Sequence, residues 1–358
     1  MVAKPLIVSR LKIENLRNIR QAELEPHPSL NYFSGSNGAG KTSVLEAVSL
    51  LSRGRSFRTK QASELTGGEG RSYRVFAEGA DASGTNHRLG LQRQGGNWKA
   101  RLDGAVIKQL SQLSRVLPTV VMEPDSHLLV GGVPEYRRRY LDWGMFHVEP
   151  GFLDLWRNFS KALKQRNSAL RRSQTDVLDS VDDVLARYGS ELAEFRKRHA
   201  QKVSERMEDM LKALKTRVQS VEIRYQKGWK ADSYLASLQK RRSRDLERCT
   251  TTSGPHRADL NLLCDGVPAR AVLSRGEQKA FAAAMLLTQA NLLSEAKRKP
   301  VLLLDDLVSE FDRDHFLTVL DKSLEGEYQV WVTGTDVPVL DAGHKMFHVE
   351  QGSIRELV

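Results

Sequence analysis

The stretch Gly35-Ser36-Asn37-Gly38-Ala39-Gly40-Lys41-Thr42 decides the fold of this chain. Its first and last glycines enclose four residues and run into a lysine and a threonine, which is the spacing of a phosphate-binding loop, or P-loop. The apolar run 30–33 predicts the strand that enters such a loop, and the apolar spacing in 42–51 predicts the amphipathic helix that leaves it. The sequence therefore predicts a nucleoside triphosphate site. A Gly-rich turn that precedes Lys-Thr by chance is the alternative, and it would not need these flanks.

Each residue type in the loop has a chemical role. The glycines let successive backbone N–H groups point at phosphate oxygens, and the following helix adds its positive N-terminal dipole. Lys41 would reach the β- and γ-phosphates of ATP, and the Thr42 hydroxyl would hold a magnesium ion. The predicted nucleotide-binding residues here are Gly35, Ser36, Asn37, Gly38, Ala39, Gly40, Lys41, Thr42 and Ser43.

Two carboxylates follow an apolar run near the end of the chain. Residues 301–304 are Val-Leu-Leu-Leu, and Asp305 and Asp306 come directly after them. A buried parallel strand ends in this way when its carboxyl edge faces a ligand. Asp305 is then the expected magnesium partner of the P-loop threonine, and Asp306 the carboxylate that acts on the attacking water. A strand followed by a polar turn is the structural alternative. Residues 329–334 predict another buried strand, after which Thr335 could sense the γ-phosphate.

A second anion site is predicted at the start of the long apolar helix 280–293. Ser274, Gly276 and Gln278 lie just ahead of it, in the segment Leu-Ser-Arg-Gly-Glu-Gln. Backbone N–H groups at a helix N-terminus favour phosphate. Capping of the helix by the serine is a complete structural explanation by itself.

Composition limits the class of protein. The 358 residues carry a net charge of +11 with pI about 9.6, which indicates polyanionic partners, with nucleic acid ahead of a membrane surface. The two cysteines, Cys249 and Cys264, form no metal-ligand cluster and fit a reducing compartment, so we expect a cytoplasmic protein. No apolar run is long enough for a membrane span, and residues 1–10 lack a signal-peptide core.

The positive charge is concentrated in a helical region. Residues 152–217 carry apolar residues at three- and four-residue spacing, which predicts a helix bundle. Residues 135–249 contain 26 Lys and Arg against 17 Asp and Glu, most of the surplus of the whole chain. This charge can be a solvated helix face or a DNA-facing surface. Arg55 and Arg58, on either side of an aromatic residue, suit phosphates and stacked bases, and an exposed basic loop is the alternative.

The N-terminal part predicts strands. Residues 6–13 indicate a half-buried strand, and the turn at Arg17 and Asn18 leads to a second one. These two turn residues are weak candidates for contact with the base or ribose. Residues 73–107 alternate between turn signals and predict an antiparallel meander, which we expect to complete the sheet that carries the P-loop.

The motif set, in its order, resembles the ABC-type ATPase heads of the SMC branch, and among them the RecF family of bacterial recombinational DNA repair. The resemblance runs nearly end to end and rests on the P-loop, the paired aspartates and the segments 124–142, 254–257, 273–278 and 309–312. Val133 departs from the family, which usually has a small residue there.

The resemblance implies an α/β fold: an ABC/SMC-like P-loop ATPase head with a mixed sheet, and a helical lobe inserted between its two halves. The expected ATPase lobe is 1–125 with 250–358, and the expected basic helical lobe is 126–249. The resemblance also implies an ATP-dependent homodimer, in which Ser274 and Gly276 of one copy close over the γ-phosphate held by the other. Asp306 in place of the glutamate of transporter-type relatives, and Thr335 in place of their histidine, imply slow, DNA-stimulated hydrolysis.

The implied function is binding of gapped DNA at single-strand to double-strand junctions and, with RecR and RecO, loading of RecA. Arg137 and Arg138, in one of the family segments, are candidate DNA contacts beside the two loop arginines. A transporter ATPase subunit, an SMC-like structural clamp and a small-molecule kinase are the alternatives. The basic insert argues against the first, the short insert against the second, and the helix-start motif at Ser274 against the third.

Overall fold

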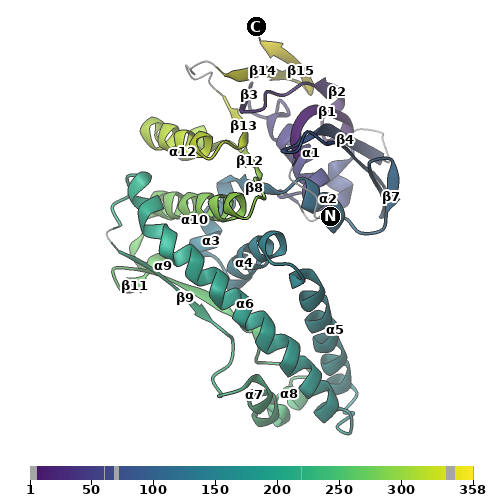
Figure 1. Cartoon of the computed structure of the whole chain (residues 1–358), viewed down its shortest axis with the longest axis vertical. Coiled ribbons are helices and arrows are strands. Elements are labelled where there is room, and N and C mark those ends of the chain that lie inside the picture. Colours follow the sequence, from purple (N-terminus) through teal and green to yellow (C-terminus); the bar gives the residue numbers. More distant parts are fainter. Residues whose placement is uncertain (1–5, 60, 68–71, 219, 336–342, 358) are drawn as a thin grey trace. The chain divides into compact units, whose positions relative to one another are not determined.

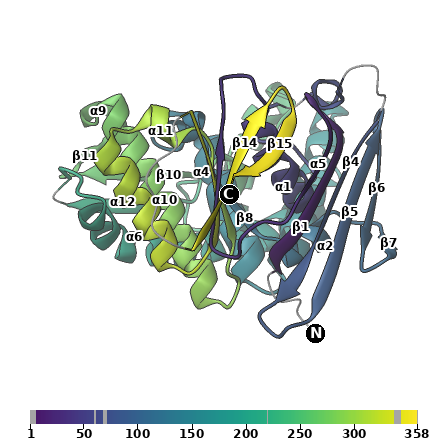
Figure 2. The same ribbon diagram turned by 90° about the horizontal axis from the view of Figure 1, so that it is seen from above.

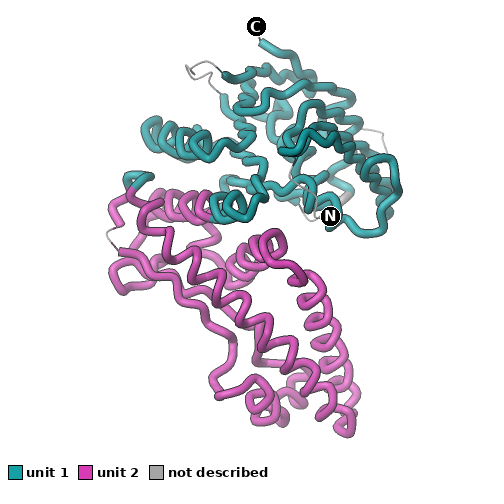
Figure 3. Tube along the Cα trace, viewed as in Figure 1, with its two compact units in different colours: residues 1–126, 213–215, 289–358 teal, residues 127–212, 216–288 magenta. Residues whose placement is uncertain are grey.

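The computed structural model describes residues 6–59, 61–67, 72–218, 220–335 and 343–357. The chain forms two compact units (Figures 1 and 3). The first unit comprises residues 1–126, 213–215 and 289–358, and the second comprises residues 127–212 and 216–288. Among the described residues, no helix is both long and apolar enough to cross a membrane.

The P-loop belongs to a mainly parallel sheet in the first unit. Its strand order is β15-β14-β3-β13-β12-β8, with only β15 antiparallel to its neighbour. Strands β3, β8, β12 and β13 are buried along their whole length, which is why they read as continuous apolar runs in the sequence. The strands are β3 (Leu30–Ser34), β8 (Thr119–Met122), β12 (Val301–Leu304), β13 (Gln329–Gly334), β14 (His344–Glu350) and β15 (Ser353–Leu357).

A second, antiparallel sheet in the same unit has the order β2-β1-β4-β5-β6-β7, and Figure 2 shows its long strands side by side. The predicted meander is confirmed, but the expectation that it completes the P-loop sheet is wrong. Its first strand, β4, pairs along its length with β1 and not with a parallel strand. The strands are β1 (Leu6–Leu16), β2 (Ile19–Leu24), β4 (Ser72–Asp81), β5 (Asn86–Gln94), β6 (Asn97–Leu102) and β7 (Ala105–Ile107).

Helix α1 (Lys41–Arg53) contacts strands of both sheets. It is therefore buried on nearly every side, including the polar Ser43, Glu46 and Ser49, where the sequence predicts an amphipathic helix. The side chains of α1 and of both sheets form one hydrophobic core. The other helices of this unit are η1 (Ala62–Leu65), α2 (Ser111–Val116), η2 (Pro124–His127, at the boundary), α11 (Leu307–Glu310) and α12 (Arg313–Glu325).

The second unit is mainly helical and contains a three-stranded antiparallel sheet of order β11-β10-β9. The predicted apolar stripes of its long helices are buried, for example at Phe159 and Leu192. Its elements are α3 (Leu128–Gly131), α4 (Pro134–Val148), α5 (Phe152–Arg171), α6 (Leu178–Ala213), β9 (Val221–Gln226), α7 (Tyr234–Lys240), α8 (Arg242–Glu247), η3 (Pro255–Arg257), β10 (Asp259–Cys264), β11 (Val267–Pro268), α9 (Ala269–Val272) and the first part of α10 (Arg275–Glu295).

The compact units differ from the lobes expected from the sequence. Residues 250–288, expected in the ATPase lobe, group with the helical segment. The reason is local pairing: β10 pairs with β9 over its whole length, and α4 contacts β10. The assignment of this segment to the ATPase lobe stays a prediction about function.

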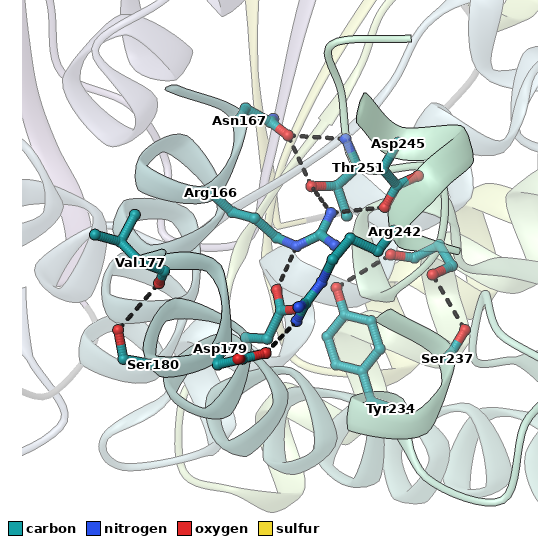
Figure 4. A network of polar contacts seen from close by, with 12 residues as sticks. Arg166, Asn167, Val177, Asp179, Ser180, Tyr234, Ser237, Arg242, Asp245 and Thr251 are labelled. Carbon is teal, nitrogen blue, oxygen red and sulfur yellow. Dashed lines mark hydrogen bonds and ion pairs between the residues drawn. The ribbon is translucent and has the colours of Figure 1, made fainter. Parts of the chain in front are cut away.

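A buried ionic network ties three helices of the second unit to one loop (Figure 4). Arg166 of α5 is fully buried and donates to Asp182 of α6 at 2.5 Å and to Asp245 of α8 at 2.6 Å. It also donates to the Thr251 hydroxyl at 2.9 Å, and Asp245 accepts from the backbone and hydroxyl of Thr252. These bonds satisfy charges that would otherwise be costly to bury, and they fix the loop ahead of η3.

Candidate nucleotide-binding site

The P-loop adopts a backbone that only glycine accommodates. Gly35, Gly38 and Gly40 have φ of 149°, 79° and 116°, in the left-handed region. A Cβ on Gly35 would lie 2.2 Å from the backbone oxygen of Val349, and one on Gly40 would lie 2.9 Å from Asn18. The curled loop is therefore held by close packing as well as by its own backbone.

Lys41 lies inside the curve of the loop. Its Nζ donates to the backbone oxygens of Gly35 at 2.7 Å and Ser36 at 3.0 Å, and the residue is 7% exposed. Burial lowers the pKa of Lys41, while the charges of Asp306 and Asp305 oppose that shift. Two backbone oxygens of the loop thus accept from the ammonium, and phosphate oxygens can take their place as acceptors.

The Thr42 hydroxyl joins the loop to the end of β12. It donates to Asp305 Oδ1 at 2.8 Å, and the Thr333 hydroxyl donates to the same oxygen at 2.9 Å. Burial raises the pKa of Asp305, and the two hydroxyls partly offset this rise. A desolvated carboxylate beside a hydroxyl suits a hard cation such as Mg²⁺, so Thr42 and Asp305 fit the predicted metal. No cluster of three or more His, Cys, Asp or Glu able to hold a metal occurs in the described ranges.

Asp306 has an unusual backbone, with φ of 54° in the left-handed region, which aspartate tolerates better than most residues. Its N–H donates to the Thr333 hydroxyl at 2.8 Å. Thr333 therefore positions both aspartates, a role that the sequence does not predict; the residue predicted to sense the γ-phosphate is Thr335. That residue is exposed in the bend after β13, and its role as a γ-phosphate sensor stays a prediction.

Glu123 is a second residue that the sequence analysis missed. It follows β8 as Asp305 follows the neighbouring parallel strand β12, and Asp305 N donates to Met122 O at 2.8 Å. Burial raises the pKa of Glu123 to about 7. Burial also lowers the pKa of Arg53, whose charge favours the ionised Glu123, to about 10. The position of a carboxylate directly after a buried strand was the available signal.

The turn between β1 and β2 supports the loop from outside. The Asn18 amide donates to the backbone oxygens of Gly38 at 3.2 Å and Ala39 at 2.9 Å. Arg17 donates to the fully buried Glu46 of α1 at 2.8 and 3.0 Å. The weak prediction of base or ribose contacts for these two residues is not supported, because both side chains bond to the protein.

The two loop arginines are both exposed. The charge of Arg58 lowers the pKa of both Asp305 and Glu123, so it lies beside the nucleotide site. The charge of Arg55 lowers the pKa of Arg53. The DNA contacts predicted for them remain predictions, and the location of Arg58 favours a phosphate of the nucleotide as its partner.

The signature segment begins α10 in the second unit. The Ser274 hydroxyl and backbone N–H both donate to Glu277, at 2.7 and 2.9 Å, and Glu277 N–H donates back to the hydroxyl at 3.3 Å. This is a capping box, so the capping role is present. Ser274 and Gly276 are exposed, and a Cβ on Gly276 would meet no atom within 4 Å. The Gln278 amide donates to Leu273 O at 3.0 Å.

Arg137 corrects a prediction. Its guanidinium is buried, bonds to both Asp259 oxygens at 2.7 and 3.1 Å, and donates to Gly132 O at 2.9 Å. It fixes α4 to β10, so it is not available to a DNA phosphate. Arg138 is half-buried and donates to Ala258 O at 2.8 Å, which also indicates a structural role.

The fold and the site define a P-loop ATPase head of the ABC/SMC type. Residues 7–355 match the family model described as RecF/RecN/SMC N terminal domain. The chain is 41% identical to a DNA replication and repair protein RecF of Xanthomonas oryzae pv. oryzae, over 97% of this chain and 99% of the relative. A relative of the same description from Stenotrophomonas maltophilia is 40% identical over 97% of this chain and 98% of its own. The chain belongs to the RecF family.

Solved structures agree with this assignment. The recombination mediator protein RecF with ATP, in the RecFOR pathway, has a TM-score of 0.89 and 27% identity, over 99% of both chains. An Smc head bound to the C-winged helix domain of ScpA has a TM-score of 0.59 and 14% identity, over 98% of this chain and 96% of its own, and shows the fold alone.

Proposed function

We propose that the chain binds ATP with magnesium at the P-loop and hydrolyses it. The loop backbone and Lys41 hold the phosphates, and Thr42 and Asp305 hold the metal, which when bound offsets charge on the transferred phosphoryl group. The observation that carries this proposal is the 2.8 Å bond between Thr42 and Asp305, which joins loop and strand across 263 residues of sequence. The ATP bound by the solved RecF relative supports the choice of nucleotide.

Two copies of the chain share each ATP. The exposed signature of one copy, with Ser274 and Gly276, closes over the γ-phosphate held by the P-loop of the other. The capped helix start supports this role, because its remaining N–H groups and dipole suit an anion.

Hydrolysis is slow and stimulated by DNA. Asp306 orients the attacking water. Its charge opposes the burial that lowers the pKa of Lys41, so it lies near the predicted phosphate site. Its side chain is one methylene shorter than glutamate, so it holds that water less closely, and hydrolysis serves as a timer on the DNA-bound dimer.

The dimer acts in recombinational repair in the cytoplasm. It binds gapped DNA at junctions of single and double strands and, with RecR and RecO, promotes loading of RecA. The names of the relatives and the net charge of +11 support this role. Contact with phosphates independent of sequence predicts binding that weakens steeply as salt rises.

Light-scattering mass with magnesium and ATP, ADP or no nucleotide tests the shared site. We expect ATP alone to double the mass, and Lys41→Met or Ser274→Arg to abolish the doubling. Lys41→Met is expected to lose ATP binding, whereas Ser274→Arg keeps it in the monomer. A protein that stays monomeric with ATP bound would leave Ser274 as a helix cap only and overturn the shared site.

A further inference from the structure

Beyond Asp154 in its first turn, helix α5 of the second unit (Figure 1) carries only basic charges. Residues 155–175 contain six Lys and Arg and no Asp or Glu. Only Arg166 among these six is buried, where the two buried aspartates of the network neutralise it. Helix α6 differs: its 36 residues hold seven Lys and Arg and eight Asp and Glu. The single sign of charge in residues 155–175 is therefore not a general property of the helices in this unit.

Four of these basic residues form the α5 stripe, defined as Arg157, Lys161, Lys164 and Arg171. Their spacing of four, three and seven residues places them on one side of the helix. The last three are exposed and make no ion pair in the described part of the chain, while Arg157 lies 3.4 Å from Asp154. Like charges at this spacing destabilise a helix, so the three residues Lys161, Lys164 and Arg171, which have no acidic partner among the described residues, favour an anionic ligand.

The stripe has the dimensions of a nucleic-acid backbone. From Arg157 to Arg171 the helix rises about 21 Å at 1.5 Å per residue, which equals about six base steps at 3.4 Å each. At its start, Trp156 is 41% exposed and adjoins Arg157 in sequence. An exposed indole beside cations suits stacking on an unpaired base. The opposite side of α5, with Phe152 and Phe159, is buried in the protein, so that apolar side is not available to a membrane.

We propose that the α5 stripe binds the DNA backbone and that Trp156 stacks on the first unpaired base of a junction. This inference rests on the proposed DNA-binding function. It places DNA binding on the α5 stripe and assigns recognition of the junction to Trp156. The Lys and Arg side chains contact phosphates of either duplex or single strand, whereas the indole has a partner only where a base is unpaired.

Fluorescence anisotropy of the full chain with magnesium and ATP tests the stripe, using a labelled blunt duplex and the same duplex with a single-stranded tail. The variant Lys161→Gln/Lys164→Gln/Arg171→Gln should bind both DNAs about tenfold or more weakly at 0.15 M salt. The slope of log affinity against log salt should fall by about 2 to 3, because each lost phosphate contact removes about 0.9.

The matched control is Lys197→Gln/Lys202→Gln/Lys212→Gln, which removes the same charge from the outside of α6. It should retain the wild-type slope and affinity. Circular dichroism and the ATP-dependent mass verify that both variants fold and dimerise. An equal loss of DNA affinity in both variants would mean that only the net charge matters, and it would overturn the proposal.

Trp156→Ala should weaken the tailed duplex about tenfold, leave the blunt duplex unchanged, and be rescued by Trp156→Phe. Equal weakening of both DNAs would overturn the stacking role.

If wild type binds DNA but the stripe variant binds equally well, only the α5 proposal fails. If wild type binds no DNA with ATP, the proposed function fails. If the stripe variant binds DNA like the wild type but no longer binds phosphatidylglycerol vesicles that the wild type binds, the stripe is a membrane contact and the proposal is overturned.

Discussion

His256 should make the stability of the protein depend on pH. Its Nε2 lies 2.9 Å from the backbone oxygen of Thr251, which can only accept, so Nε2 carries the proton of the neutral ring. Nδ1 is buried without a partner, so a second proton would leave an N–H⁺ with no acceptor. Burial lowers the pKa of His256 from 6.5 to about 4; the hydrogen bond to Thr251 and the charge of Asp245 oppose this shift, and the charges of Arg257 and Arg138 add to it.

The sign and size of the effect follow from linkage. Between pH 6.5 and 4 the unfolded chain binds a proton at this residue and the folded chain does not. Stability is therefore full above pH 6.5 and falls as pH drops toward 4. With these two pKa values of His256, lowering the pH from 7 to 5 costs about 2 kcal/mol.

Urea unfolding of nucleotide-free protein at pH 7, 6 and 5 measures this cost. His256→Gln keeps an N–H donor for the Thr251 oxygen and does not titrate. The wild type should lose about 2 kcal/mol more than the variant between pH 7 and 5. If both proteins lose the same free energy of unfolding, His256 is protonated freely in the folded state and the reasoning is wrong.

Three further substitutions test other parts of the structure. Arg166→Met should cost about 3–5 kcal/mol in urea unfolding, because it leaves the buried Asp245 without a cation and Asp182 with Arg242 alone. As a control, Arg172→Met at an exposed position should change the free energy of unfolding very little. Equal losses in the two variants would mean that water reaches the network. The pKa of Glu123 is raised in the folded state to about 7. The contribution of this carboxyl group to folding stability is therefore full below pH 4.5 and is lost as pH rises through 7. Glu123→Gln should therefore raise the free energy of unfolding by up to about 3 kcal/mol at pH 8 without metal or nucleotide, and an unchanged stability would contradict the raised pKa of this half-buried carboxyl. Gly35→Ala should weaken binding of a fluorescent ATP analogue at least about tenfold, since its Cβ would meet Val349 O at 2.2 Å; wild-type affinity would show that the loop can shift.

The sequence predicted the parts of the fold that local pattern determines. Continuous apolar runs marked β12 and β13, and alternation marked the strands of the meander. Strand pairing is not local, so the separation of the two sheets was missed: no feature within β4 indicates that its partner is β1. The burial of α1 on nearly all sides was missed for the same reason, since it depends on two sheets that the sequence does not place.

Motif spacing predicts which residues of the candidate site meet, while their roles toward nucleotide and metal stay predictions. Thr42 and Asp305 come together as expected, with a bond of 2.8 Å. The sequence does not predict the contact of Thr333 with Asp305, because that contact depends on the register of β13. The role of Thr335 as a γ-phosphate sensor stays a prediction. The sequence predicts Arg137 as a DNA contact, because charge in a sequence does not reveal a partner 122 residues away.

The place of β3 in its sheet has a consequence for synthesis of the chain. This strand, which leads into the P-loop, pairs on one side with β13 and on the other with β14. Both partners are made about 300 residues later, which at about 5–20 residues per second is a delay of roughly 15 to 60 s on the ribosome. During that time the nascent loop has no sheet behind it. A fragment from a stalled ribosome that stops before β13 therefore cannot build the nucleotide site and cannot compete with the finished protein for ATP.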